Sequence, residues 1–327
     1  MKRTGNLYQH ICSIENLWLA DNKARKGKQK QYGVQKHDKN REANLFHLQS
    51  LLKSRTYETS TYSVFPVYEP KERLVYRLPY FPDRIAQHAV MNVLEPIFIA
   101  SLTTDTYSCI KGRGLHAAVK KIKKALRDVT GTRYCLKLDI TKFYPSVDHD
   151  ILQEQLRKKF KDADLLWLLD EMIDSAPGLP IGNYLSQYLA NYYLSGFDHW
   201  IKQKKGVRYY FRYADDIVIF APDKESLHAL RKDIQEYLQV NLKLQVKSNY
   251  QVFPIDDRGL DFLGYVFFHK CTYLRKSIKQ RFARSIWHGT GFQTISAYWG
   301  WVKHCNGRNL MRKLVPERYE EIYKQAA

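Results

Sequence analysis

The stretch Phe211-Arg212-Tyr213-Ala214-Asp215-Asp216-Ile217-Val218-Ile219-Phe220 decides the fold. Runs of aromatic and β-branched residues flank two adjacent carboxylates, a pattern that predicts a strand, a tight turn and a second strand. Like charges at the tip of a hairpin repel each other and add nothing to a core, so a bound cation is the physical reason to place them there. A bare Asp-Asp pair is otherwise only a polar turn.

A third carboxylate has the same setting. Asp139 ends the short apolar run Tyr134-Cys135-Leu136-Lys137-Leu138, which also predicts a strand. Three carboxylates at strand ends can hold two divalent metal ions, roughly 3.5 to 4 Å apart, as enzymes of phosphoryl transfer do. Asp139, Asp215 and Asp216 are therefore the predicted catalytic residues.

Composition and charge limit the possible partners. The 327 residues are 44% apolar and 14% aromatic, enough for a substantial core in one large or two to three small domains. Fifty-three Lys and Arg residues against thirty-three Asp and Glu give a net charge of +20, which predicts a polyanionic partner. No run of eighteen apolar residues is present, so nucleic acid is favoured over membrane. The first residues lack the apolar stretch of a secretory signal, and we expect a cytoplasmic protein.

Tyr213-Ala214-Asp215-Asp216 resembles the Tyr-x-Asp-Asp box of reverse transcriptases, and Asp139 matches the aspartate of their first palm motif. The resemblance implies an RNA-templated DNA polymerase of mixed α+β class, with fingers, a ferredoxin-like palm and a helical thumb. It implies two Mg²⁺ ions, with Mn²⁺ as a possible substitute, on Asp139, Ile140, Asp215 and Asp216. It also implies an RNA template, a DNA or RNA primer extended to cDNA, and deoxynucleoside triphosphates.

The same resemblance divides the chain. It predicts a helical and basic N-terminal extension over residues 1–60, fingers over 61–132, a palm over 133–265 with a fingers segment at about 150–185, and a thumb over 266–327. Residues 23–41 hold eight Lys or Arg residues and one acid, which leaves a solvated face and a phosphate contact both open. We expect a helix from Pro82 until Pro96, and a strand over Leu242-Lys247 that completes the palm.

Several residues match the family's nucleotide-binding positions. Glycines around Lys111 and Arg113 allow backbone and side chain to approach phosphate together. By resemblance, Tyr144 blocks a ribose 2′-hydroxyl, although it could also be a core aromatic, and Lys247 lies near the leaving pyrophosphate unless it is a plain surface lysine. The predicted nucleotide-binding residues are Arg84, Lys111, Arg113, Thr141, Lys142, Phe143, Tyr144, Ile181, Gln187 and Lys247.

Ile181-Gly182-Asn183-Tyr184-Leu185-Ser186-Gln187 indicates a subfamily. Many related enzymes have Gln-Gly where this chain has Ile-Gly, and the motif is similar to that of reverse transcriptases from diversity-generating retroelements. That resemblance implies a template-repeat RNA, infidelity at template adenines, a small basic accessory protein, and a bacterial, archaeal or phage origin. Group II intron-like, retron-like and defence-associated reverse transcriptases remain alternatives.

The C-terminal region is one-sided in charge. Between Phe262 and Pro316 there are ten Lys or Arg residues and no Asp or Glu, interleaved with tryptophans that pack in a core or stack on bases. The predicted nucleic-acid-binding residues are Arg275, Lys276, Lys279, Arg281, Arg284 and Lys303. A protein that kept the polymerase fold only to bind RNA is the alternative from another class, and the three carboxylates argue against it.

Overall fold

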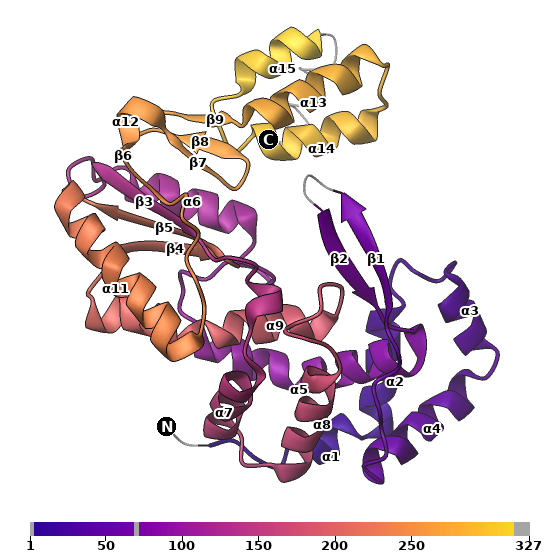
Figure 1. Cartoon of the computed structure of the whole chain (residues 1–327). Coiled ribbons are helices and arrows are strands. Elements are labelled where there is room, and N and C mark those ends of the chain that lie inside the picture. The colour runs from indigo at the N-terminus through magenta and orange to yellow at the C-terminus, as the bar shows by residue number, and fades with distance from the viewer. Residues whose placement is uncertain (1–2, 69–71, 317–327) are drawn as a thin grey trace. The chain divides into compact units, whose positions relative to one another are not determined.

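The computed structural model describes residues 3–68 and 72–316, which form two compact units (Figure 1). One unit, which we call the helical unit, takes in the chain up to Thr104, Ile140–Lys204 and Gln235–Val246. The other, which we call the sheet unit, takes in Asp105–Asp139, Lys205–Ile234 and the chain from Lys247 onward. The last eleven residues of the predicted thumb, 317–327, and residues 1–2 lie outside the described residues.

Among the helices of the helical unit, three begin with a side-chain cap. Ser13, Asp148 and Asp162 each accept a hydrogen bond from a backbone amide in the first turn of the helix that follows, which satisfies a donor with no partner in its own helix. The helices are α1 (Tyr8–Ile11), α2 (Ile14–Ala24), α3 (Tyr32–Asp38), α4 (Arg41–Lys53), α5 (Ile85–Ser101), α7 (His149–Lys159), α8 (Ala163–Asp174), α9 (Tyr184–Tyr193) and α10 (Ser195–His199).

Helix α5 runs through Pro96 to Ser101, so the prediction that Pro96 ends it was wrong. A proline inside a helix removes one backbone hydrogen bond and is locally unfavourable. Helix α5 is nevertheless buried on both sides of it, at Leu94 and Phe98, which are 0% exposed. Tertiary packing of this central helix therefore outweighs the local preference.

A two-stranded hairpin, β1 (Ser63–Tyr68) and β2 (Glu72–Arg77), belongs to the helical unit. The strands are antiparallel, with Val64 opposite Tyr76. The Tyr76 amide donates to the Ile181 carbonyl at 2.8 Å, which ties the hairpin to the segment before α9.

A four-stranded antiparallel sheet of order β4-β5-β3-β6 organises the sheet unit. Its strands are β3 (Tyr134–Asp139), β4 (Tyr209–Tyr213), β5 (Asp216–Ala221) and β6 (Gln251–Pro254). Helix α6 (Leu115–Ala125) packs near β4, and α11 (Lys224–Leu242) connects β5 to β6, although its turns from Gln235 onward belong to the helical unit. β3, the first of these four strands along the chain, lies between the third, β5, and the fourth, β6, which is the predicted ferredoxin-like order.

The fourth strand is β6 and not the predicted Leu242-Lys247 segment, so that prediction was wrong. Leu242 and Leu244 are buried, but Lys243 has φ of +50° and the Leu244 amide donates to the Leu238 carbonyl, which closes the end of α11. Only Val246 forms a bridge, with Ile140. The backbone of this segment also accepts from the Thr141 amide at Gln245 and donates from Lys247 to the Asp139 carbonyl, but it forms no regular strand. The alternation of apolar residues therefore reflects burial.

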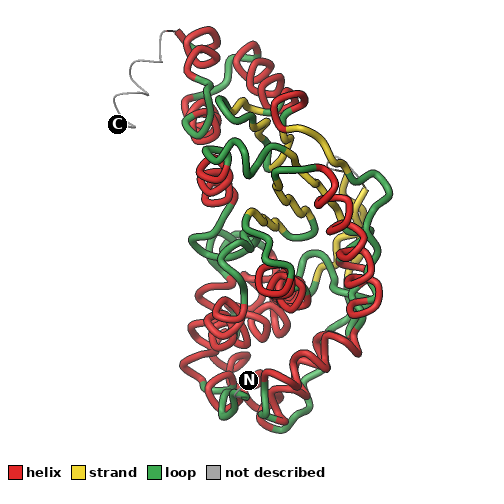
Figure 2. The backbone as a smooth tube through the Cα atoms, turned by 90° about the vertical axis from the view of Figure 1, so that its left-hand side faces the viewer, coloured by secondary structure: helices red, strands yellow, loops and turns green. Residues whose placement is uncertain are grey.

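Short strands and helices complete the sheet unit: α12 (Ile255–Arg258), β7 (Leu260–Phe262), β8 (Tyr265–Phe267), β9 (Thr272–Leu274), α13 (Lys276–Trp287), α14 (Phe292–Val302) and α15 (Arg308–Leu314). Figure 2 shows these helices in red beside the short yellow strands. One hydrophobic core joins them to the large sheet, since Val218 and Phe220 of β5, Phe262 and Tyr265 of the small sheet, and Phe282 of α13 belong to the same buried cluster. The mixed α+β class is confirmed.

Candidate active site

Three carboxylates meet at one end of the four-stranded sheet. Asp139 is the last residue of β3, and Asp216, the first residue of β5, lies directly opposite it in the antiparallel register. Asp215 precedes Asp216 in the turn after β4, where Ala214 has φ of +54°. The structure therefore brings together the three residues that we predict to be catalytic.

The carboxylates of the turn resist ionisation. Burial and the nearby Asp139 raise the pKa of Asp215 to about 6, from an ordinary 3.8. Burial also raises the pKa of Asp216, although the neighbouring Lys137 opposes this shift. Like charges in a half-buried site disfavour each other, and a proton or a bound cation relieves the repulsion.

Asp139 has one paired oxygen and one without a partner. Its Oδ2 forms an ion pair with the Lys247 ammonium, and its backbone carbonyl accepts from the Lys247 amide at 2.9 Å. Its Oδ1 is buried and has no hydrogen-bond partner among the described residues. A buried acceptor of this kind is costly unless a cation or a donor meets it.

These residues fit a divalent cation, but they do not form a closed metal site by themselves. Across residues 3–68 and 72–316, no group of three or more His, Cys, Asp or Glu side chains is placed to hold a metal ion. Hard cations commonly complete their shell with backbone oxygens, water and substrate phosphates. Ile140, predicted to contribute its backbone, begins the adjoining segment of the helical unit, and its role stays a prediction.

Lys137 is a neighbour of the site that the sequence reasoning missed. It lies two residues before Asp139 in β3, and its Nζ donates to the Asp261 carbonyl at 2.7 Å. The Asp261 carboxylate in turn accepts from Arg275 at 2.6 Å. The period of two in a strand was the available signal, because it places Lys137 on the same face as Asp139.

Two predicted phosphate-binding cations lie in the loop before α6. Gly112 has φ of +79°, a conformation that glycine adopts without strain, between an exposed Lys111 and a half-buried Arg113. The Arg113 amide donates to the Ile110 carbonyl at 3.0 Å, which closes this turn. The sheet unit thus holds Lys111, Arg113 and Lys247.

Arg84 belongs to a cluster of cations in the helical unit. Burial and the neighbouring Arg77 lower the pKa of Arg84, and burial and Arg84 lower the pKa of Lys28. Arg77 and Arg84 also line a cavity of about 630 Å³ together with Lys36 and Lys39. Cations that destabilise each other's charged form favour an anion between them.

The segment after Asp139 is a tight loop in the helical unit. The Thr141 amide donates to the Gln245 carbonyl at 2.8 Å, so it is engaged within the protein. Lys142 has φ of +43°, the Phe143 side chain is buried, and Tyr144 is half-buried in a short 3₁₀ turn, with its carbonyl accepting from the Leu179 amide. The two readings of Tyr144, sugar contact and packing, both remain predictions.

Ile181 and Gly182 are fixed against β2. The Ile181 carbonyl accepts from Tyr76, as described above, and a Cβ added to Gly182, which has φ of +119°, would lie 2.5 Å from the Tyr76 carbonyl oxygen. A side chain at residue 182 would therefore displace the hairpin strand. Gln187 is exposed on α9.

Most of the predicted nucleic-acid-binding residues are exposed. Lys276, Lys279 and Arg284 are exposed on α13, whose Phe282 is buried, and Trp287 at the end of the same helix is 86% exposed. Arg275 is half-buried and paired with Asp261, whereas Arg281 and Lys303 are exposed. Trp287 thus matches a stacking residue, while Trp299 and Trp301 pack against the core.

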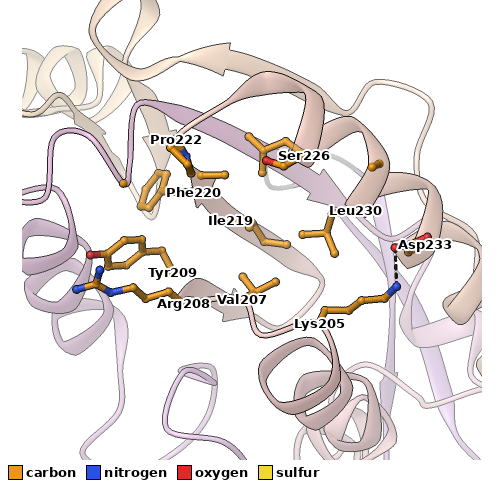
Figure 3. A pocket seen from close by; sticks show the side chains of 14 residues that line it. Lys205, Val207, Arg208, Tyr209, Ile219, Phe220, Pro222, Ser226, Leu230 and Asp233 are labelled. Atoms are coloured by element: carbon orange, nitrogen blue, oxygen red, sulfur yellow. Dashed lines mark hydrogen bonds and ion pairs between the residues drawn. The ribbon is translucent and has the colours of Figure 1, made fainter.

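The hairpin of β4 and β5 carries the predicted catalytic residues Asp215 and Asp216, and we call it the catalytic hairpin. A cavity of about 570 Å³ lies at the end of this hairpin that is opposite the Asp215-Asp216 turn (Figure 3). Val207, Ile219 and Leu230 form its apolar floor, and an ion pair of 2.6 Å between Lys205 and Asp233 borders it. Asp139, Asp215 and Asp216 are not part of its lining. The cavity is therefore separate from the candidate active site.

A ferredoxin-like sheet that carries an aspartate at the end of its first strand and an Asp-Asp pair at its central turn defines a polymerase palm. Residues 69–267 match the family described as reverse transcriptase (RNA-dependent DNA polymerase), and the chain belongs to that family. Reverse transcriptases typically act with a divalent metal on an RNA template and nucleotide substrates. The predicted enzyme class is confirmed.

Relatives place the chain near group II intron enzymes. Protein YkfC of Escherichia coli is 26% identical over 247 residues, which cover 61% of this chain and 65% of YkfC. The group II intron-encoded protein LtrA of Lactococcus lactis is 29% identical over 139 residues, which cover 39% of this chain and 23% of LtrA. The chain therefore spans less than two thirds of the length of these relatives.

Solved structures of telomerase share the fold. Apo telomerase from Candida tropicalis superposes with a TM-score of 0.53 at 10% identity, over 82% of this chain and 60% of that one. Telomerase from Candida albicans gives 0.51 at 11% identity, over 84% and 57%. None of the helices in the described part of the chain combines the length and apolar character needed to span a bilayer.

Proposed function

We propose that this protein is the reverse transcriptase of a diversity-generating retroelement, which copies a template-repeat RNA into cDNA with errors at template adenines. The observation that carries the polymerase activity is the set of three carboxylates at one sheet end, with a buried Asp139 oxygen that lacks a partner and a raised pKa at Asp215. The motif Ile181-Gly182 with Ser186-Gln187 supports the assignment to a diversity-generating retroelement.

Asp139, Asp215 and Asp216, with the Ile140 carbonyl, would hold two Mg²⁺ ions, for which Mn²⁺ could substitute. Such ions would supply Lewis acidity, which would activate the 3′-hydroxyl of the primer and neutralise charge on the leaving pyrophosphate. In this proposal the primer 3′-hydroxyl gives its proton to solvent, its oxygen forms a bond to the α-phosphorus, and the bond from that phosphorus to the leaving pyrophosphate breaks. The contribution of the chain is to hold the three carboxylates in register, because positioning and charge neutralisation dominate phosphoryl transfer.

In the sheet unit, Lys111, Arg113 and Lys247 would provide cations for the triphosphate. In the helical unit, Arg84 is proposed to bind nucleotide phosphate, and the cation cluster around it supports an anion there. In this proposal the Tyr144 ring excludes the ribose 2′-hydroxyl, and the exposed basic residues of α13 follow the primer and template backbone.

A group II intron-like enzyme is the second candidate. The relatives favour it, because LtrA is a group II intron-encoded protein. The two candidates differ in fidelity, since only the retroelement enzyme is expected to misread adenine, and in partners, since it would act with a small basic accessory protein.

Primer extension on a defined RNA template tests both the polymerase activity and the assignment to a retroelement. The wild type should extend a primer in Mg²⁺, and the double variant Asp215→Ala, Asp216→Ala should not, while its RNA affinity stays equal or rises because two negative charges are removed. RNA binding without extension on any primed RNA would support the non-catalytic alternative. Sequencing of the cDNA then separates the subfamilies, because equal accuracy at all four template bases would contradict the retroelement.

A further inference from the structure

Arg212 is a fully buried guanidinium within the catalytic hairpin. It is 0% exposed and lies in β4, three residues before Asp215. A buried charge is retained only where its hydrogen-bond donors are used well. Its Nη1 donates to the carbonyl oxygen of Ala214 at 3.0 Å.

The acceptor of this bond belongs to the most constrained residue of the turn. Ala214 has φ of +54°, in the left-handed region that any residue with a Cβ disfavours. This conformation reverses the chain between Tyr213, the last residue of β4, and Asp216, the first of β5. A charged donor on the Ala214 carbonyl favours the conformation that places Asp215 beside Asp139.

The backbone of Arg212 is also held, on the outer edge of β4. Its amide donates to the Asp105 carbonyl and its carbonyl accepts from the Tyr107 amide, both at 3.0 Å. The strand therefore cannot shift along this neighbour without losing two bonds. The same neighbour leads into the loop of Lys111 and Arg113.

We propose that Arg212 is a positioning residue, whose buried guanidinium holds the Tyr213–Asp216 turn so that Asp215 faces the metal site. The proposal rests on the polymerase function stated above. It assigns to Arg212 an effect on geometry, because its guanidinium donates to the Ala214 carbonyl within the turn.

The test compares Arg212→Gln with Arg208→Gln, a matched control from the residue just before β4 whose side chain is 77% exposed. Binding of Mn²⁺ alone, followed by electron paramagnetic resonance, reports the site without turnover. Single-nucleotide extension gives kcat and KM. Arg212→Gln should bind Mn²⁺ roughly tenfold more weakly and lose about a hundredfold in kcat, since small displacements in an active site have effects of this size. The KM for nucleotide should change less than about threefold, and Arg208→Gln should match the wild type.

Arg212→Ala allows chemical rescue by guanidinium, which a merely structural role of Arg212 would not permit. Millimolar guanidinium should restore part of its kcat, and the same addition should leave Arg208→Ala unchanged. If Arg212→Gln does not fold, Arg212→Lys retains the charge with a different donor geometry, and its kcat should fall about tenfold.

The proposal would be overturned if Arg212→Gln folds and keeps the Mn²⁺ affinity and kcat of the wild type. If Arg212→Gln does not fold, the same result for a folded Arg212→Lys would overturn it. A wild type that binds Mn²⁺ but never extends a primer would instead count against the polymerase function. The Mn²⁺ comparison would still decide the role of Arg212 in that case.

Discussion

Replacing Asp215 by asparagine should stabilise the metal-free protein while abolishing polymerisation. Folding raises the pKa of this carboxyl to about 6 from 3.8, so the folded state binds the proton more tightly than the unfolded chain. The stability that the folded state gains from this tighter proton binding is fully present below pH 3.8 and is lost as the pH rises through 6. Ionised Asp215 therefore costs about 3 kcal/mol at pH 8 and about half of that at pH 5.

Denaturant unfolding in EDTA, followed by tryptophan fluorescence, measures this difference in the free energy of unfolding. Trp299 and Trp301, which lie in the same unit as Asp215, contribute to the signal. Asp215→Asn should exceed the wild type by up to about 3 kcal/mol at pH 8, with a smaller gap at pH 5. Mg²⁺ should stabilise the wild type and narrow the gap. Asp257→Asn, at an exposed acid of α12, is the control and should change little. An Asp215→Asn protein that is no more stable than the wild type at pH 8 would refute the electrostatic reasoning.

Three further changes test the proposed contacts. Tyr144→Ala should raise ribonucleotide incorporation roughly tenfold or more with a modest loss of deoxynucleotide incorporation, and equal discrimination in side-by-side extension would make Tyr144 a packing residue. Reversing Lys276, Lys279 and Arg284 to Glu should flatten the log–log salt dependence of single-strand binding by about 2, at about 0.7 per contact; an unchanged slope would place the nucleic acid elsewhere. Ile181→Gln adds a hydrogen-bonding amide at residue 181, and one hydrogen bond is worth roughly 0.5 to 1.5 kcal/mol. Misincorporation at template adenine should therefore fall by up to about tenfold. Sequencing of the cDNA measures the error rate, and an unchanged rate at adenine would contradict this role of Ile181.

The catalytic hairpin could be predicted because its signal is local. Apolar residues on both sides of Asp215 and Asp216 predict β4 and β5, and the register then places Asp139 opposite Asp216. The same reasoning fails where tertiary packing decides. Pro96 stays inside α5 because the helix is buried on both sides of it. The apolar alternation after Leu242 is buried but forms only an isolated bridge and no regular strand.

Single side chains of the site were harder to predict than its strands. Arg212 lies two residues after the buried Tyr210 in β4, so the period of two places both side chains on the same face and was a signal that a charge lies inside. The ion pair of Lys247 with Asp139 has no such signal, because it joins residues 108 positions apart. Contacts over such distances in sequence depend on the whole fold.

The hydrophobic core shared by β5, the small sheet and α13 limits how the protein can be dissected. Val218 and Phe220 are buried in the same cluster as Phe262, Tyr265 and Phe282, and a Cβ on Gly264 would already collide with Trp301. A fragment cut after the small sheet would leave this apolar underside in water and would be prone to aggregate. A minimal polymerase engineered from this chain must therefore retain the C-terminal helices, because they complete the hydrophobic core beneath the four-stranded sheet.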